Sequence, residues 1–345
     1  MKIIQAGIGN MGDHWLQVVQ ASTEVEHAGF VEVNQEAIDY QVENAGIDPD
    51  LVFATLGESL DAVDAADAVL IVTPPALHRL MSEVAMERGI PVLSEKPLAD
   101  TLENAQAIVD KANETGVLHM VTQNYRYNPQ AQTVKQVLAS GELGAVGAVS
   151  VKFYKSLIRY GFHQQLTYPL LLDMTIHHFD MMRFFLDADP LSIFGRSWNP
   201  AWSWFNGDAS TALILDFPDD VVVAYDGSWV ATGMETPWNA NWRFECEKGV
   251  LTLQDDEVFI QRKTDTIAFP EGYRQYLNEV VEPVPLVEVE YERQGYLLHE
   301  FYEAVTLGKS PVTTCQDNII SYQMVWDAIE SFVTGETVRR PGDQA

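Results

Sequence analysis

The sequence predicts an α/β protein in which an N-terminal, doubly wound parallel sheet precedes a C-terminal α/β domain built on a mostly antiparallel sheet. Three observations support this. Short apolar runs alternate with amphipathic stretches over the first half, a glycine-rich turn follows the first run, and the rhythm changes after Asn124. With 345 residues the chain exceeds the usual size of a single core. We therefore expect two domains, residues 1–124 and 125–345.

The N-terminal half reads as strands joined by helices. Each predicted strand is a short apolar run, and most are followed by an amphipathic stretch, which is typical of a parallel sheet covered by helices. Such a sheet binds ligands at the carboxyl ends of its strands. The predicted strands are 1–6, 27–33, 68–72, 91–94 and 117–123, and the predicted helices are 12–21, 76–88 and 102–114.

The C-terminal half shows a different pattern of predicted helices and strands. After a helix, a strand and a second helix, short strands and turns continue to about residue 289, and the end of the chain is helical again. Pro218-Asp219 and Lys248-Gly249 are typical of hairpin turns, which favours antiparallel pairing. The predicted helices are 127–140, 173–186, 299–307 and 317–334, and the predicted strands are 144–154, 211–217, 221–229, 242–246, 250–253 and 258–261.

Composition narrows the classes of function. Fifty acidic residues against 21 basic ones give a net charge of −29. Such a surface repels nucleic-acid backbones and anionic bilayers, so we expect neither as a partner. No run approaches the roughly 18 apolar residues of a membrane span. The two cysteines, Cys246 and Cys315, have no zinc-site spacing. We expect no metal site, and free thiols in a reducing cytoplasm.

A G-x-G-x-x-G motif stands between the first predicted strand and the first predicted helix, which is the context that the motif requires. Its first glycine allows a tight turn, its second lets a pyrophosphate approach, and its third packs the helix on the strand. The helix N-terminus offers unpaired N–H groups and a positive dipole end to phosphates. The sequence therefore predicts a Rossmann dinucleotide-binding domain. The motif residues are Gly7, Ile8, Gly9, Asn10, Met11 and Gly12.

Further cofactor contacts are expected at the strand ends. Glu32 follows Gly12 by about twenty residues, where a carboxylate accepts hydrogen bonds from the adenosine ribose and repels a 2′-phosphate. This favours NAD, with NADP as the alternative. Thr73 and Pro74 follow the third strand, either beside the nicotinamide or as a rigid connector only. The predicted cofactor set also includes His78, Glu95, Lys96 and Asn124.

Two polar groups point to chemistry at an alcohol. Lys96 follows a buried strand, where its ammonium could stabilise developing alkoxide charge. Asp173 and His177 lie at i and i+4 and share a helix face in an otherwise apolar segment. A carboxylate near an imidazole raises its basicity, which suits proton removal from a hydroxyl. The alternatives are a surface lysine and an Asp/His pair that only stabilises its helix.

The chain resembles the glucose–fructose oxidoreductase/inositol dehydrogenase (Gfo/Idh/MocA) family over nearly its whole length. The order and spacing of several segments carry the resemblance. They are AGIGNMG, VTPPALH, SEKPLADTLENA, QNYRYNP, GELGAVG, LLLDMTIHHFD and GKSPVTTCQDNIISYQMVWDAIES. The resemblance implies a Rossmann domain and an α/β domain whose large open sheet serves as an oligomer interface, hence a homodimer or homotetramer. It also implies that Lys96 contacts the substrate hydroxyl, that His177 is the acid/base, and that Asp173 supports both.

Two departures from the family pattern concern the site. Leu170, Leu171 and Leu172 stand before the motif aspartate, where some relatives carry glycines, so the pocket floor is expected to differ in shape. Glu32 replaces the commoner aspartate and adds one methylene at the ribose.

The predicted function is an NAD-dependent dehydrogenase that oxidises a secondary hydroxyl of a sugar, sugar derivative or polyol by hydride transfer to nicotinamide. The alternatives are an NADP-dependent keto-sugar reductase, an NAD-dependent glycosidase, and a non-catalytic regulator that senses a sugar or cofactor. Intact Lys96, Asp173 and His177 argue against the regulator. The candidate substrate contacts are Arg126, Tyr154, His163 and Tyr168, with Lys155 and Trp229 as further pocket candidates.

Overall fold

The computed structural model describes residues 1–63, 65–156, 158, 161–264, 266–268, 272, 274–276 and 280–340. The chain divides into two compact units. The first comprises Met1–Asn124 and Glu290–Gln323, and the second comprises Tyr125–Val289 and Met324–Ala345. One break follows residue 124, where the sequence also placed a boundary. The return of residues 290–323 to the first unit differs from the sequence-based division, which assigned the whole C-terminal end to the second domain.

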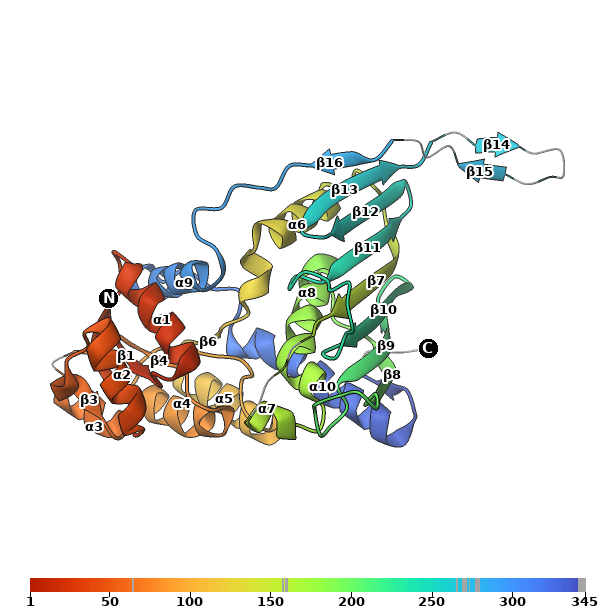
Figure 1. The fold of residues 1–345 in the computed structure, drawn as a ribbon. Helices are drawn as coiled ribbons and strands as arrows, with labels where there is room; N and C mark the ends of the chain where they lie inside the picture. The colour runs from red at the N-terminus through yellow and green to blue at the C-terminus, as the bar shows by residue number, and fades with distance from the viewer. Residues whose placement is uncertain are drawn as a thin grey trace. The chain divides into compact units, whose positions relative to one another are not determined.

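The first unit contains a six-stranded sheet in the order β3-β2-β1-β4-β5-β6, and all of its strand pairs are parallel (Figure 1). This is the Rossmann order, in which the chain reverses direction across the sheet between β1 and β4. The predicted fold class of the N-terminal half is confirmed. The strands are β1 (Lys2–Ala6), β2 (Glu26–Val31), β3 (Val52–Phe53), β4 (Ala68–Ile71), β5 (Val92–Ser94) and β6 (His119–Val121).

The helices of the first unit follow its strands, and two of them, α2 and α3, escaped the sequence analysis. Only Gln41 of α2 is fully buried, and the apolar stripe of this helix is short: Ile38, Val42 and Ala45 pack against the core while partly exposed. The helix α3 begins with a capping box formed by Thr55 and Glu58, a signal that could have located it. The helical segments are α1 (Asn10–Ala21), α2 (Gln35–Ala45), η1 (Pro49–Leu51), α3 (Leu56–Ala62), η2 (Pro75–Leu77), α4 (His78–Glu87) and α5 (Leu102–Thr115).

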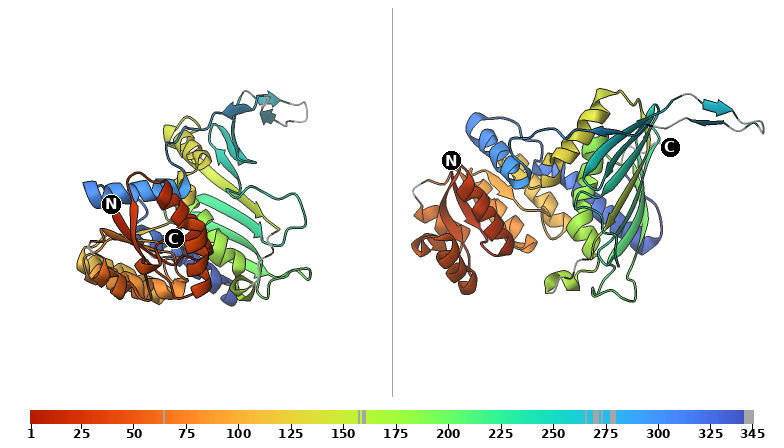
Figure 2. Two further views of the ribbon diagram at one scale, coloured as in Figure 1. Left: turned by 60° about the vertical axis from the view of Figure 1, so that its left-hand side comes forward. Right: turned by 45° about the horizontal axis from the view of Figure 1, so that its top comes forward.

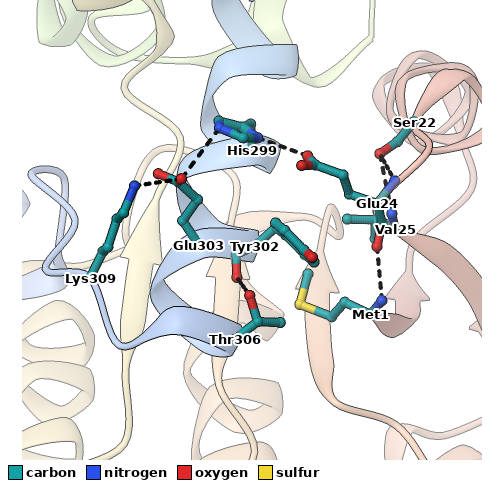
Figure 3. Close-up of polar contacts among 9 residues, drawn as sticks. All are labelled: Met1, Ser22, Glu24, Val25, His299, Tyr302, Glu303, Thr306 and Lys309. Carbon is teal, nitrogen blue, oxygen red and sulfur yellow. Dashed lines mark hydrogen bonds and ion pairs between the residues drawn. The ribbon is translucent and has the colours of Figure 1, made fainter.

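The segment that returns near the C-terminus adds to the first unit in two places. The amide of Val121 in β6 donates to the carbonyl of Thr313, at 2.8 Å. The helix α9 (Arg293–Leu307) contacts α1, and its His299 Nδ1 lies 2.7 Å from the Glu24 carboxylate in the α1–β2 connection (Figure 3). The same figure shows Glu303 between His299 and Lys309. These contacts hold α9 against the sheet domain.

The second unit is built on a nine-stranded sheet in the order β16-β13-β12-β11-β7-β10-β9-β8-β17. Only β7 and β10 pair in parallel, and the other pairs are antiparallel. The predicted, mostly antiparallel large sheet is confirmed. Its strands are β7 (Val146–Tyr154), β8 (Ser192–Trp198), β9 (Ser210–Phe217), β10 (Val221–Ser228), β11 (Asn241–Cys246), β12 (Gly249–Gln254), β13 (Glu257–Arg262), β16 (Glu282–Val284) and β17 (Val338–Arg339), and a separate hairpin holds β14 (Thr266–Ala268) and β15 (Arg274–Tyr276).

Helices cover one face of the nine-stranded sheet (Figure 2). On β7, Phe153 points toward these helices and is buried, so Tyr154 points to the opposite, outer face. None of the described helices is long and apolar enough to cross a bilayer. The helical segments are η3 (Asn124–Tyr127), α6 (Pro129–Ser140), α7 (Phe162–Gln165), η4 (Leu171–Thr175), α8 (Ile176–Leu186) and α10 (Cys315–Thr334). The division between the two units falls within η3, after Asn124, and within α10, after Gln323.

Candidate dinucleotide and catalytic sites

The turn between β1 and α1 requires glycine at two positions. Gly7 has φ +94°, and a Cβ there would lie 2.6 Å from the carbonyl oxygen of Val72. A Cβ on Gly12 would lie 2.4 Å from the carbonyl oxygen of Gly7. Both distances are shorter than real carbon–oxygen contacts, so the turn and the start of α1 pack backbone against backbone. This is the close approach that the G-x-G-x-x-G motif serves.

Two buried glutamines hold the carbonyl groups of this turn. Gln5 Nε2 donates to the carbonyls of Gly7 (3.1 Å) and Gly12 (2.8 Å). Gln41 Nε2 donates to the carbonyl of Ile8, at 3.1 Å. Sequence analysis missed both residues because their partners are backbone atoms brought near by folding. They fix the shape of the turn, whose first two amides, those of Gly7 and Ile8, donate to the Val31 carbonyl and the Glu32 carboxylate.

The start of α1 and the end of β2 present groups that fit a dinucleotide. Gly9 is the N-cap of α1, and no side chain caps the helix there. Gly9, Asn10 and Met11 are exposed, so their backbone can receive a phosphate at the positive end of the helix dipole. Glu32, just beyond β2, accepts hydrogen bonds from the amides of Ile8 (3.2 Å) and Asn34 (2.9 Å). Its carboxylate thereby lies beside the glycine-rich turn, where an adenosine ribose would bind.

The turn after β4 holds one residue that the sequence analysis placed wrongly. Thr73 is half-buried and Pro74 is exposed, so both remain able to face a cofactor. His78, in contrast, has 0% exposed surface. Its Nδ1 lies 3.0 Å from the carbonyl oxygen of Pro97, and its Nε2 lies 2.9 Å from that of Thr73. Its assignment as a cofactor contact is corrected, because the ring offers no surface to a ligand.

Lys96 follows β5 and is held by its backbone. Its amide lies 3.1 Å from Glu95 Oε2 and 3.2 Å from Thr122 Oγ1. The other oxygen of Glu95 accepts a hydrogen bond of 2.7 Å from the indole N–H of Trp15, in α1. The Glu95 carboxylate is buried and both of its oxygens bond to protein, and its contact with the cofactor stays a prediction. Lys96 itself is half-buried, as is Asn124 at the start of η3.

In the second unit, the segment that carries Asp173 and His177 is not one regular α-helix. Residues Leu171–Thr175 form a π-helical turn that continues directly into α8. Such turns occur frequently at functional sites. Asp173 lies in the π turn and is half-buried, and His177 lies in the first turn of α8 with 5% of its surface exposed. The sequence predicted a helix here but contains no marker for the extra residue in its turn.

Tyr125 is a neighbour of His177 that sequence analysis missed. The two rings have centroids 4.6 Å apart and planes tilted by 36°. The hydroxyl of Tyr125 lies 3.9 Å from Met174 Sδ, in the π turn. The adjacent His178 turns toward the sheet, where its Nδ1 lies 3.0 Å from the hydroxyl of Tyr225. Burial lowers the pKa of His178 to about 3, so its ring is neutral and part of the core.

The candidate substrate contacts do not form one group. Arg126 is buried and holds Asp180 with two hydrogen bonds of 2.5 and 2.6 Å, so its planar fork is used within the core. Tyr154 donates to Asp226 on the outer face of the sheet, opposite to α8. Both assignments are corrected. His163 and Tyr168 are half-buried, and the Tyr168 ring lies 5.6 Å from that of Phe332.

The two further pocket candidates also have protein partners. Trp229 is only 1% exposed and packs edge-on against Phe153, so it belongs to the core. Lys155 lies 3.2 Å from Glu235.

The outer face of the nine-stranded sheet carries a cavity of about 1070 Å³. Aromatic side chains line it, and Tyr154 and Asp226 lie among them. Burial and the neighbouring Asp226 carboxylate raise the pKa of Tyr154. Phe194 and Trp202 are well exposed there. This surface is therefore a separate apolar face, and α8 lies on the other side of the sheet.

Comparison with known proteins adds to this geometry. Residues 1–123 match a family described as "Oxidoreductase family, NAD-binding Rossmann fold", and residues 131–252 match the "GFO/IDH/MocA C-terminal domain". The chain belongs to the Gfo/Idh/MocA family. It is therefore an oxidoreductase, and NAD is its cofactor. The fit of the glycine-rich turn and Glu32 to a dinucleotide agrees with this membership.

Individual relatives span most of the chain. The uncharacterized protein y4oX of Sinorhizobium fredii is 28% identical over 98% of this chain and 95% of its own. The scyllo-inositol 2-dehydrogenase (NAD(+)) of Bacillus subtilis is 28% identical over 79% of this chain and 77% of its own. Among solved structures, an oxidoreductase from Agrobacterium radiobacter in complex with NAD+, L-tartaric acid and magnesium shares the fold, with a TM-score of 0.83 and 19% identity over 98% of each chain.

Proposed function

We propose that this oxidoreductase is an NAD-dependent dehydrogenase of a polyol or sugar, acting on a secondary hydroxyl. The observation that carries the proposal is the nearly buried imidazole of His177, which lies against the tilted ring of Tyr125 and one helical turn from Asp173. The imidazole of histidine is the side chain that most often takes or gives a proton in general acid–base catalysis. The resemblance to a scyllo-inositol 2-dehydrogenase supports the substrate class.

In the proposed mechanism the substrate hydroxyl loses its proton to His177 as the carbinol carbon is oxidised to a carbonyl. Lys96 donates a hydrogen bond to the same oxygen and stabilises the negative charge that develops on it. Asp173 orients His177 and favours the imidazolium that forms. NAD, when bound, supplies the acceptor for the hydride that leaves the carbon. The glycine-rich turn, Glu32 and the Thr73–Pro74 turn are proposed to hold it.

The deciding experiment follows NADH absorbance with scyllo-inositol, myo-inositol and a panel of aldoses, each with NAD+ and with NADP+. We expect at least one polyol or sugar to reduce NAD+ and to do so better than NADP+. Lys96→Ala and His177→Ala should each lower kcat by about 100-fold or more, since general acid–base groups contribute 10²–10⁴-fold. Retained binding of NAD would show that the fold is intact.

Lys309→Ala is the matched control, because Lys309 is an exposed lysine just beyond the end of α9 that pairs with the Glu303 carboxylate. Its kcat should stay within about two-fold of the parent. Near-normal turnover by either of the other two variants removes that residue from the mechanism. Failure of every alcohol in the panel to reduce either cofactor would overturn the substrate class.

A further inference from the structure

The turn that carries Lys96 is joined to the turn after β4 by one buried imidazole. His78 is the first residue of α4, and no part of its surface is exposed. Its two ring nitrogens face two carbonyl oxygens, that of Thr73 at 2.9 Å and that of Pro97 at 3.0 Å. Thr73 lies in the turn after β4, and Pro97 is bonded directly to Lys96. The ring therefore lies between these two turns.

We propose that His78 is a positioning residue that fixes the Lys96 turn against the β4 turn at the carboxyl edge of the parallel sheet. This inference deepens the proposed function and rests on it for the role of Lys96. It assigns His78 no contact with cofactor or substrate, because the ring is enclosed by protein. Its effect is transmitted through two backbone carbonyls.

The hydrogen-bonding capacity of the ring makes this contact strong. A neutral imidazole donates one N–H, so it bonds to one carbonyl, whereas the imidazolium donates to both. Burial lowers the pKa of His78, and the two carbonyls and the Glu95 carboxylate act in the opposite direction. In either form the ring bonds to the carbonyl of at least one of the two turns. Because the ring is fully buried, a hydrogen bond lost there is not replaced by one to water.

Other residues hold the backbone of Lys96 itself. Its amide is placed by Glu95 and Thr122, and Glu95 is in turn held by Trp15 of α1. These contacts hold the residue before the proline. The carbonyl after it, on Pro97, is held by His78. Together they clamp the lysine from both sides, and a shift of about 1 Å at a reacting group is enough to cost about 10²-fold in rate.

The chain offers a matched control in His119. This histidine is also buried, with 1% exposure, and its Nε2 lies 2.9 Å from Ser82 Oγ on the same helix, α4. This bond ties His119 to Ser82 and not to the Thr73 or Pro97 carbonyl. His78→Leu and His119→Leu therefore remove the same ring from the same core, and only the first releases the two turns.

The first measurement is amide hydrogen exchange in the peptide 94–99, which includes the amides of Glu95 and Lys96. In His78→Leu we expect exchange there to rise about ten-fold or more, as local opening becomes easier, and in His119→Leu to stay within about two-fold of the parent. His78→Gln, whose amide can still donate to one carbonyl, should lie between. It also serves if His78→Leu does not fold. Equal exchange in the His78 and His119 variants would overturn the proposal.

The second measurement separates positioning from folding. With scyllo-inositol, or the panel alcohol that reduces most NAD+, His78→Leu should lower kcat by about ten-fold or more. The Kd for NAD should rise by a smaller factor, because the Thr73–Pro74 turn is only one of the three proposed cofactor contacts. His78→Gln should recover part of kcat. If Lys96→Ala turns over normally, the role of Lys96 fails, and the exchange experiment still decides whether His78 holds the turn. If Lys96→Ala is inactive and His78→Leu behaves like His119→Leu, the positioning role fails alone.

Discussion

The ring of Tyr125 lies against the imidazole of His177, with centroids 4.6 Å apart. Tyr125 is in the short helix η3 and His177 is in the first turn of α8, so this contact joins two segments that are distant in sequence. An aromatic neighbour restricts the rotation of an imidazole and shields part of its surface from water. We therefore expect Tyr125 to set the orientation in which His177 meets a substrate.

Replacing Tyr125 tests this relationship. Tyr125→Ala removes the ring, and kcat should fall about ten-fold, because the imidazole gains rotational freedom. Tyr125→Phe keeps the ring and removes the hydroxyl, which lies 3.9 Å from Met174 Sδ, so its kcat should stay within about three-fold. Steady-state kinetics on the two variants and the parent provide the measurement. Equal losses in both would assign the effect to the hydroxyl instead.

Glu32 should determine the choice between the two nicotinamide cofactors. Its carboxylate lies beside the glycine-rich turn and would repel a 2′-phosphate. Glu32→Gln keeps one acceptor oxygen but removes the charge, so the preference for NAD+ over NADP+ should shrink by about ten-fold, or about 1.4 kcal/mol. Titration of intrinsic fluorescence with each cofactor measures this. Glu36→Gln, an exposed residue in α2, should leave the ratio unchanged.

The sequence predicts most of the features that depend on local chemistry. The G-x-G-x-x-G turn follows from neighbours along the chain, and so do the strand–helix alternation and the hairpin turn at Asp219 and Asp220, both of which have positive φ. The orientation of Tyr154 was also available, because the apolar alternation of Val149, Val151 and Phe153 assigns the next residue to the other face.

Other features depend on contacts that no local pattern encodes. Arg126 is a predicted substrate contact, and its partner Asp180 is 54 residues away along the chain. No residue pattern marks the π turn at Leu171–Thr175, and the helix α2 shows only a short apolar stripe of Ile38, Val42 and Ala45. His78 was assigned to the cofactor because its motif adjoins the site. Folding instead places the ring between the turn after β4 and the Lys96 turn, where its two nitrogens face the carbonyl oxygens of Thr73 and Pro97.

Stability should fall as the solution is acidified, because several histidines are buried in neutral form. Burial lowers the pKa of His27 to about 4 and the pKa values of His119 and His178 to about 3. In the unfolded chain each ring titrates near 6.5. Above that pH neither state binds the proton and the full stability is present.

As the pH falls below about 6.5 the unfolded state binds protons that the folded state excludes, so unfolding becomes easier by up to about 1.4 kcal/mol per pH unit for each ring. The loss continues until the pH reaches the folded pKa values. Thermal melts between pH 8 and about pH 5 should therefore show a falling Tm. His178→Gln should flatten this slope, and the exposed His14→Gln should not. A Tm that stays level over this range would contradict the neutral, buried assignment.

The outer face of the nine-stranded sheet is the surface on which a second copy of the chain is predicted to pack, in accordance with the oligomer implied by the family resemblance. Ile214 of β9 is 45% exposed there, while its neighbour Leu213 points to the helices and is 2% exposed. Ile214→Asp therefore places a charge on this face without disturbing the core. Desolvating an unpaired carboxylate costs several kcal/mol, so self-association should weaken by about 10²-fold or more.

Light scattering after size exclusion measures the result as a shift from dimer or tetramer toward monomer. Leu80→Asp is the control, since Leu80 is 60% exposed on α4 of the other unit and should leave the mass unchanged. A parent protein that is monomeric at high concentration would end the prediction. If the Ile214→Asp variant keeps the oligomeric mass of the parent protein, the interface lies on another surface.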